Sequence, residues 1–264
     1  MSCCPPDSTP YLAADYAAKG AKIDADGTAC YATGAADAST VILLLPDVWG
    51  WDSGRTRAIA DLLADALSAR CYVPKLLQPA LEGGTDGDGL PPDFDIGARG
   101  AEFGPWAKQI TWGEVVKPAL VALLAHAKGA AAAAAAAEPK VGVVGCCWGA
   151  WAAFHASAEL EGIGAGVCFH PSAHIEAGLF GGDNGALAAA TRAPFLLLPA
   201  GNDPAVYDEG GEMFAALRPG SATRRFGEMT HGWVPRGDLA DGAVRRDVEK
   251  ALADATAFFK AKLV

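Results

Sequence analysis

Short continuous apolar runs alternate along the chain with longer segments in which apolar residues recur every three or four positions. An apolar run of four to eight residues is typical of a strand buried on both faces of a parallel sheet, whereas the longer spacing predicts helices. We therefore expect strands at 40–45, 71–73, 140–144, 164–169, 194–199 and 221–226. The helical spacing predicts helices at 55–68, 112–127, 150–160, 206–217 and 244–262, with Pro118 as a kink or restart point.

The remaining segments predict turns and loops. Residues 1–19 are rich in Pro and Ala and predict an irregular leader, after which Asp26-Gly27 separates the two arms (21–23 and 29–32) of a short hairpin. Residues 79–105 are rich in Gly, Asp and Pro and predict a long surface loop that could contact substrate. Strands that alternate with helices predict one α/β domain over 1–264, with a doubly wound, mostly parallel sheet.

Composition excludes some classes of partner. The chain has 264 residues, of which 51% are hydrophobic, and a formal net charge of −10. A surface of this charge repels polyanions, so we expect no nucleic-acid partner. The strongest apolar runs are far shorter than a membrane-spanning helix, and the alanine run at 130–137 inflates the apolar fraction, so we expect no membrane partner either. We expect the alanine run itself to be a helix end or a surface extension.

The cysteines indicate a reducing compartment. There are seven of them, with no pair of CxxC motifs, and the chain start lacks the charged and apolar regions of a signal peptide. We therefore expect thiols in a cytoplasmic protein.

One cysteine lies in a sequence typical of a nucleophile. Gly145-Cys146-Cys147-Trp148-Gly149 fits G-x-C-x-G, a sharp turn between a strand and a helix, with glycines where a Cβ atom would clash. Both glycines flank the centre only when Cys147 is that centre, so Cys147 is the candidate nucleophile and Cys146 a packing residue. The alternative is that both cysteines pack as small apolar side chains.

An acid and a histidine follow in the order that such an enzyme requires. Of the four histidines after Cys147, His231 lies in a loop before the last predicted helix, and Asp203 ends a predicted buried strand. Asp203 would hold the His231 tautomer and stabilise its imidazolium, although an Asp in a Gly-Asn-Asp-Pro turn can also be only a turn former. The backbone N–H groups of Val48 and Trp148 are the expected oxyanion donors.

Together these features resemble the dienelactone hydrolases, the cysteine-nucleophile branch of the α/β-hydrolase fold. The resemblance rests on the leader Ser2-Cys3-Cys4-Pro5-Pro6, on Leu45-Pro46-Asp47-Val48-Trp49-Gly50, on 145–149, on Phe169-His170-Pro171-Ser172, on 201–204 and on His231-Gly232-Trp233. It implies a Cys147–His231–Asp203 triad that hydrolyses a lactone or small ester through an acyl-thioester, without metal or cofactor.

The resemblance also implies roles around the triad. Asp47 would modulate the nucleophile, and Arg236, Arg55 and Trp49 would contact the substrate, with Arg99 as a further arginine available in the mid-chain loop. It implies a small lactone or ester substrate, neutral or anionic, and a monomer or weak dimer.

Two other functions stay open at this stage. A chain with this fold can be a non-catalytic binding protein, because fold does not fix function. The adjacent Cys146 and Cys147 could instead serve a redox-sensing protein or another thiol-dependent esterase or thioesterase.

Overall fold

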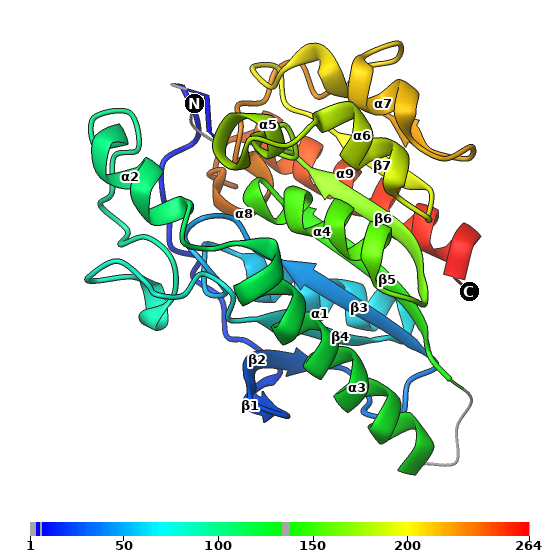
Figure 1. Cartoon of the computed structure of the whole chain (residues 1–264). Coiled ribbons are helices and arrows are strands. Elements are labelled where there is room, and N and C mark those ends of the chain that lie inside the picture. Colours follow the sequence, from blue (N-terminus) through cyan, green and yellow to red (C-terminus); the bar gives the residue numbers. More distant parts are fainter. Residues whose placement is uncertain (1–3, 6, 134–137, 264) are drawn as a thin grey trace.

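In the computed structural model, eight strands of the described residues, 4–5, 7–133 and 138–263, form one twisted sheet (Figure 1). The strand order is β1-β2-β4-β3-β5-β6-β7-β8. Strands β1 and β4 each pair antiparallel with β2, and the other neighbours are parallel, which confirms the mostly parallel sheet. The strands are β1 Ala21–Ala25, β2 Thr28–Thr33, β3 Thr40–Leu45, β4 Arg70–Pro74, β5 Lys140–Cys146, β6 Ile163–Phe169, β7 Phe195–Leu198 and β8 Ala222–Thr223.

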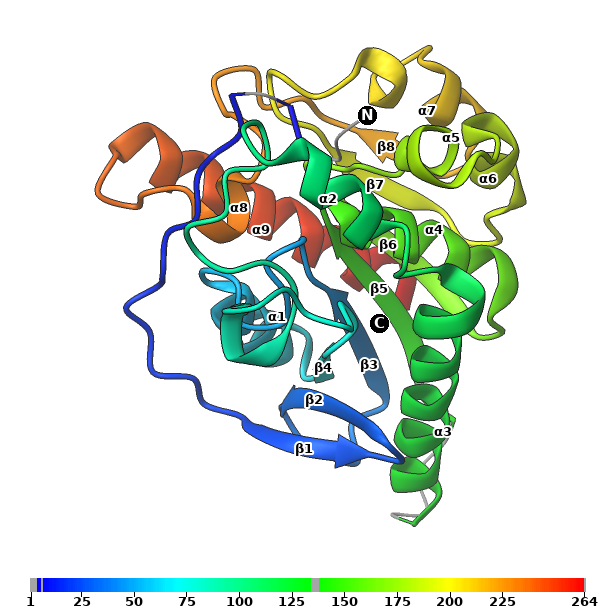
Figure 2. The ribbon, with the colours of Figure 1, turned by 60° about the vertical axis from the view of Figure 1, so that its left-hand side comes forward.

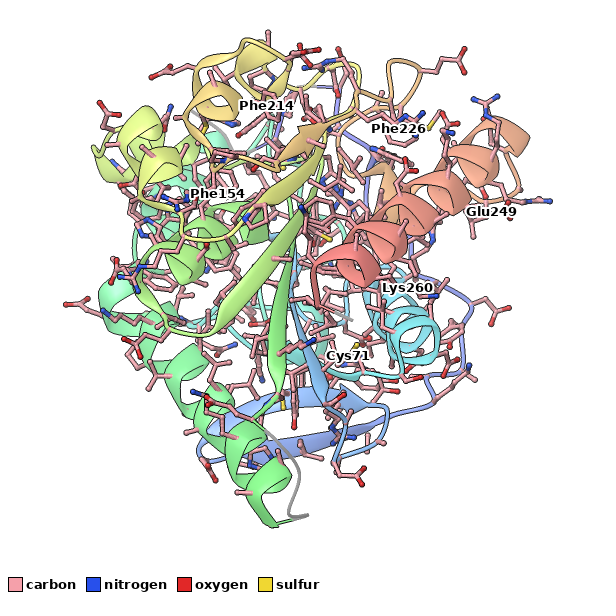
Figure 3. The ribbon with its side chains drawn as sticks, turned by 90° about the vertical axis from the view of Figure 1, so that its right-hand side faces the viewer. Cys71, Phe154, Phe214, Phe226, Glu249 and Lys260 are labelled. Carbon is pink, nitrogen blue, oxygen red and sulfur yellow. The ribbon has the colours of Figure 1, made fainter. Side chains whose placement is uncertain are left out.

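Helices cover both faces of this sheet. Helices α1 and α9 pack on one face, and α3 and α4 on the other; Figure 3 shows the sheet edge-on between the two layers. The α-helices are α1 Thr56–Leu67, α2 Gly100–Ala107, α3 Lys117–Ala133, α4 Trp148–Glu159, α5 Ile175–Phe180, α6 Asn184–Ala190, α7 Glu212–Ala216, α8 Trp233–Arg236 and α9 Gly242–Leu263. Shorter helical turns are η1 Thr85–Gly87, η2 Trp112–Val116 and η3 Ala205–Tyr207.

The central strand β3 explains why its sequence is apolar throughout. Val41, Leu43 and Leu45 enter the core beneath α3 and α4, whereas Ile42 and Leu44 enter the core beneath α1 and α9. Successive side chains of a strand point to opposite faces, so a strand covered on both sides buries every residue.

Two predicted elements in the C-terminal half of the chain are shorter than expected. The single helix predicted over 206–217 is wrong: η3 and α7 are separate, and Gly210 between them has a φ of 81°, which breaks the helix. The strand predicted over 221–226 is reduced to β8, followed by one isolated bridge between Ala200 and Phe226.

The predicted surface loop at 79–105 is partly wrong. It contains η1 and the start of α2, and it buries apolar side chains among the main core. These anchors are Leu90, Phe94 and Phe103, joined by Trp106 within α2. The Gly and Pro content signalled irregular backbone correctly, but the few large apolar residues hold that backbone against the protein.

The helical segment Trp112–Ala133 is longer than the short apolar runs that predict the strands. By length and composition only, it is long and apolar enough to cross a membrane. In this fold it packs against the sheet through Leu120, Leu123 and Ala127. It bears a π-type turn, η2, just before Pro118, where a restart was predicted. Residues 134–137 of the alanine run lie outside the described residues.

The described part of the leader is irregular, as expected, and runs along one side of the molecule to β1 (Figure 2). The Asp61 carboxylate on α1 accepts hydrogen bonds from the Tyr16 hydroxyl and the Lys19 N–H, each at 3.0 Å. At its other end the Thr9 N–H donates to the His231 carbonyl at 2.7 Å. The leader thus reaches the carboxyl ends of the central strands, where the candidate residues gather. Residues 2, 3 and 6 of its Ser-Cys-Cys-Pro-Pro sequence, and residue 1 before it, lie outside the described residues.

Candidate active site

Cys147 occupies the sharp turn that the glycine pattern predicts. Strand β5 ends at Cys146 and α4 begins at Trp148, and Cys147 between them has φ 52° and ψ −116°, a strained conformation for a residue with a Cβ. A Cβ on Gly149 would strike the Leu45 carbonyl oxygen, and one on Gly145 would lie 2.5 Å from the Ala150 Cα. Both glycines are therefore required for the close approach of β3, β5 and α4.

The neighbouring cysteine does not share this environment. Cys146 packs in the core beneath α1 and α9, whereas Cys147 belongs to the core on the opposite side of the sheet. Burial raises the pKa of the Cys146 thiol well above its usual range, with the charge of Asp47 adding to the rise. A vicinal disulfide, on which the redox alternative depends, would require both sulfurs to leave these sites.

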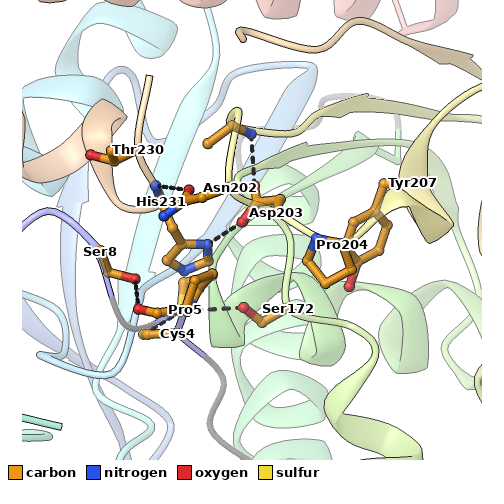
Figure 4. A network of polar contacts seen from close by, with 12 residues as sticks. Cys4, Pro5, Ser8, Ser172, Asn202, Asp203, Pro204, Tyr207, Thr230 and His231 are labelled. Atoms are coloured by element: carbon orange, nitrogen blue, oxygen red, sulfur yellow. Dashed lines mark hydrogen bonds and ion pairs between the residues drawn. The ribbon is translucent and has the colours of Figure 1, made fainter. Parts of the chain in front are cut away.

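His231 and Asp203 form a buried pair at the carboxyl end of the sheet (Figure 4). The His231 Nδ1 lies 2.6 Å from the Asp203 Oδ1, and both side chains are fully buried. The other Asp203 oxygen accepts from the Ala200 N–H at 2.7 Å, and the Asn202 side-chain oxygen accepts from the His231 N–H at 2.7 Å. The carboxylate thus fixes the ring orientation and places the proton on Nδ1, which leaves Nε2 available.

Cys147 lies beside the free edge of this ring. Its Sγ, the Cys4 Sγ and a ring nitrogen of His231 all lie within 4.8 Å of one another. The Ser172 hydroxyl donates to the Cys147 sulfur at 3.5 Å, and the Ser172 N–H donates to the Cys147 carbonyl at 3.0 Å. The structure therefore brings together the three residues predicted as a triad.

The charges of this cluster favour a proton on His231. Burial by itself lowers the pKa of His231, but the charge of Cys147, then that of Asp203 and their hydrogen bonds, raise it well above the usual value. His170 lies in edge-to-face contact with His231, with ring centroids 4.8 Å apart. Burial, and then the charge of His231, hold the pKa of His170 well below its usual value. His170 thus stays neutral and does not compete for the proton.

The predicted oxyanion donors lie on adjacent strand ends. Val48 follows β3, Trp148 follows β5, and these two strands pair in parallel, with Leu45 opposite Gly145. Among the described residues, no acceptor is bonded to the N–H of either Val48 or Trp148. Both residues are buried and Trp148 directly follows Cys147, and N–H groups so placed can stabilise a developing negative charge.

Asp47 is engaged by an arginine. Its carboxylate forms a fully buried ion pair with Arg236 and accepts the Trp49 N–H at 3.1 Å. The Arg236 guanidinium also lies 4.2 Å from the Trp49 ring centroid and donates to the Thr9 carbonyl. Burial raises the pKa of Asp47; the charge of Arg236 opposes this rise and the charge of Cys147 adds to it.

A cavity of 1340 Å³ opens next to this cluster, between the leader, the 92–108 segment and α5. Of the predicted substrate contacts, Trp49 lines this cavity, whereas Arg236, Arg55 and Arg99 do not. Arg55 donates to the Gly237 carbonyl and Arg99 pairs with Glu102, so both are engaged elsewhere. The charged side chains in the cavity wall are Asp93, Asp95 and Lys108.

Cys4 belongs both to the cavity wall and to the cluster around Cys147. It lines the cavity and its Sγ is 3.6 Å from the Cys147 Sγ, while the His231 and Cys147 residues are themselves fully buried. The sequence pattern did not assign roles to Cys4 or Ser172. The sequence around each residue does not indicate a contact with Cys147, because each reaches Cys147 only when segments distant in the sequence fold together.

Known proteins resemble this chain in sequence and in structure. The model of the dienelactone hydrolase family matches residues 28–263. The carboxymethylenebutenolidase homologues of Rattus norvegicus and Homo sapiens are 23% and 25% identical over 160 residues, which cover 58% of this chain and 56% of each relative. The chain thus matches about half the length of these curated relatives.

The solved structures that resemble the chain span it almost entirely. A dienelactone hydrolase from Anabaena variabilis has a TM-score of 0.58 at 16% identity, covering 94% of this chain and 99% of that one. The dienelactone hydrolase-like promiscuous phosphotriesterase P91, from metagenomic libraries, has a TM-score of 0.56 at 15% identity with the same coverage. At such identities the likeness shows the α/β-hydrolase fold. Because the family model covers nearly the whole chain, we conclude that this protein belongs to the dienelactone hydrolase family of hydrolases.

Proposed function

We propose that this protein is a cysteine-dependent hydrolase of lactones or small carboxylic esters, with Cys147 as nucleophile. The observation that carries the proposal is the buried Asp203–His231 pair, 2.6 Å between Oδ1 and Nδ1, with Cys147 beside the ring on a strained turn. The raised pKa of His231 supports a thiolate–imidazolium pair, because the imidazolium is the form that a neighbouring thiolate stabilises.

The reaction would proceed in two halves. His231 holds the proton of Cys147, and the thiolate attacks the carbonyl carbon of the ester while the Val48 and Trp148 N–H groups stabilise the oxyanion. The C–O bond to the alcohol then breaks, and His231 protonates the departing alkoxide to leave an acyl-thioester. Neutral His231 next takes a proton from water, the hydroxide attacks the thioester, and the acid product leaves as Cys147 is released.

The cavity wall suits an ester with an apolar or aromatic group. It combines the aromatic rings of Tyr11, Trp49 and Phe94 with few charges, of which two are acidic. We propose that Lys108, rather than Arg236 or Arg55, would receive a substrate carboxylate, because it is the cation that lines the cavity. Arg236 would then act on Asp47, with which it forms a buried ion pair.

A comparison of adjacent cysteines tests the proposal. Cys147→Ala should lower the rate of p-nitrophenyl acetate and dihydrocoumarin hydrolysis by on the order of 10³-fold or more, because the nucleophile is lost. Cys146→Ala is the matched control: it is equally buried but faces the other side of the sheet, and should stay active. Mass spectrometry of quenched protein should find the acyl group on Cys147. Full activity in Cys147→Ala would exclude this function.

A further inference from the structure

A second set of interactions meets at Cys147, and the hydrolysis proposed above does not need it. The Cys4 Sγ lies 3.6 Å from the Cys147 Sγ, a separation far longer than the ~2.05 Å of a disulfide bond. A ring nitrogen of His231 completes a group of three donor atoms within 4.8 Å of one another, each on a buried residue. Since Asp203 engages Nδ1, the donor is Nε2. Figure 4 shows Cys4 close to the His231 ring.

We propose that Cys4, Cys147 and His231 form a binding site for Zn²⁺. Two thiolates and one imidazole are the soft donors that zinc prefers, and three protein ligands leave the fourth tetrahedral position for water. With Zn–S bonds of about 2.3 Å, tetrahedral geometry places two sulfurs about 3.8 Å apart, close to the 3.6 Å between Cys4 and Cys147. The same geometry requires about 3.6 Å from nitrogen to each sulfur, which the nitrogen, already within 4.8 Å, reaches by a small shift.

The surroundings support each ligand. A zinc-bound histidine usually donates its other N–H to a carboxylate, which fixes the ring, and Asp203 does this for His231. The Asp203 carboxylate is itself held by the Ala200 N–H at 2.7 Å. Two thiolates also cancel the double charge of zinc, so a site of three buried residues acquires no net charge when it loads.

Such a site would switch the enzyme off and fix the leader in place. A bound zinc ion occupies the nucleophilic sulfur of Cys147 and the lone pair of His231, so neither can react. It also ties Cys4, and with it the leader, over the turn that carries Cys147. The inhibition rests on the proposed function, whereas the metal site itself does not, and the two are tested separately.

Direct metal binding tests the site without using hydrolysis. The full-length protein, reduced and free of metal, is titrated with Co²⁺, whose thiolate charge-transfer absorption reports the number of sulfur ligands, and with Zn²⁺ in competition. We expect one equivalent with two thiolates in the wild type. In Cys4→Ser the absorption should fall to about half and the zinc affinity by at least the roughly 10–100-fold that a lost outer-shell partner costs. Cys30→Ala, a buried cysteine of β2, is the control and should bind as the wild type does.

A measurement on the wild type covers the case in which the Cys4 variant fails to fold. Zinc should protect both Cys4 and Cys147 from iodoacetamide, as read from their peptides by mass spectrometry. Alkylation of Cys4 at an undiminished rate in the presence of saturating zinc would overturn the site, and so would equal zinc affinity in Cys4→Ser and wild type.

The effect on activity is then read for each protein against its own zinc-free rate of p-nitrophenyl acetate hydrolysis. The zinc concentration that halves this rate should be at least tenfold higher for Cys4→Ser than for the wild type. Equal values would show that Cys147 and His231 bind zinc without Cys4, which contradicts the proposal. If the wild type hydrolyses no ester at all, the proposed function fails, but the cobalt and protection measurements still decide the metal site.

Discussion

At the scale of single residues, two buried histidines in contact have pKa values that are shifted in opposite directions. His231 lies between the negative charges of Asp203 and Cys147, which raise its pKa against the effect of burial. His170 has both ring nitrogens unpartnered among the described residues, and burial, followed by the charge of His231, lowers its pKa more than the charge of Cys147 raises it. The proton of the cluster is thereby directed to one ring. The order of residues in the chain was enough to predict His231, but it did not predict the contact between His231 and His170.

Asp203→Asn tests this electrostatic account. The change removes the negative charge beside His231, so the pKa of His231 falls and the imidazolium is lost at lower pH. We expect kcat/KM for p-nitrophenyl acetate to fall by about 10²–10⁴-fold, with the alkaline limb of its pH profile moved to lower pH. Asp208→Asn is the control, because Asp208 pairs with Arg225 at the surface and should leave the profile unchanged. An alkaline limb that stays in place in Asp203→Asn would contradict the account.

A second residue-scale prediction concerns the buried ion pair of Asp47 and Arg236. Arg236→Met leaves the Asp47 carboxylate buried without its partner, and we expect the free energy of unfolding to fall by about 3–5 kcal/mol in urea titrations. The double variant Asp47→Asn/Arg236→Met should recover a large part of this loss, since it leaves no charge unpaired. Arg99→Met, which breaks a surface pair with Glu102, is the control and should cost about 0–1 kcal/mol. Equal stability of Arg236→Met and wild type would refute the assignment.

At the scale of elements, the turn between β5 and α4 decides where Cys147 points. Its φ of 52° is maintained because β3, β5 and α4 approach so closely that only glycine fits at 145 and 149. The same packing places the Val48 and Trp148 N–H groups on adjacent strand ends. The sequence predicted this turn well, since its geometry follows from local residue types, and β5 and α4 lie where it placed them.

Gly149→Ala tests the close approach. The new Cβ meets the Leu45 carbonyl oxygen, so α4 must move from β3, and we expect the unfolding free energy to fall by roughly 1–3 kcal/mol or more. Because Cys147 lies at the start of α4, the rate at which it reacts with iodoacetamide should also differ from the wild-type rate. Gly129→Ala is the control: it lies in α3 with open space around its Cα, and alanine there should stabilise the helix by up to about 1 kcal/mol. A Gly149→Ala protein as stable as the wild type would show that the contact is not tight.

At the scale of the whole molecule, charge limits the substrates that approach the cavity. The chain carries a formal net charge of −10, and the cavity wall adds Asp93 and Asp95 against one Lys108. The arginines expected to offset this charge for an anionic substrate are engaged with Asp47, the Gly237 carbonyl and Glu102. The negative charge of the protein and of the cavity wall therefore favours neutral esters over anionic ones.

A salt series checks this conclusion. We expect kcat/KM at low ionic strength to be severalfold lower for mono-p-nitrophenyl succinate, which bears a carboxylate, than for p-nitrophenyl acetate. Salt near 0.5 M, where the Debye length is well under ~10 Å, should narrow the difference by raising the rate for the anionic ester. Lys108→Ala should widen the difference in kcat/KM between the two esters. A preference for the anionic ester at low salt would mean that another cation reaches the substrate.

What the sequence determined by itself was local or followed from chain order: apolar runs as buried strands, the glycine-flanked turn at Cys147, and Asp203 and His231 in the expected sequence. The tertiary structure decided what depends on long-range packing. It buried the segment near Phe94 that composition predicted as a surface loop, turned Arg236 toward Asp47, and laid the leader so that Cys4 meets Cys147. Residues 143 positions apart acquire a contact only when the whole chain folds, and no local propensity encodes it.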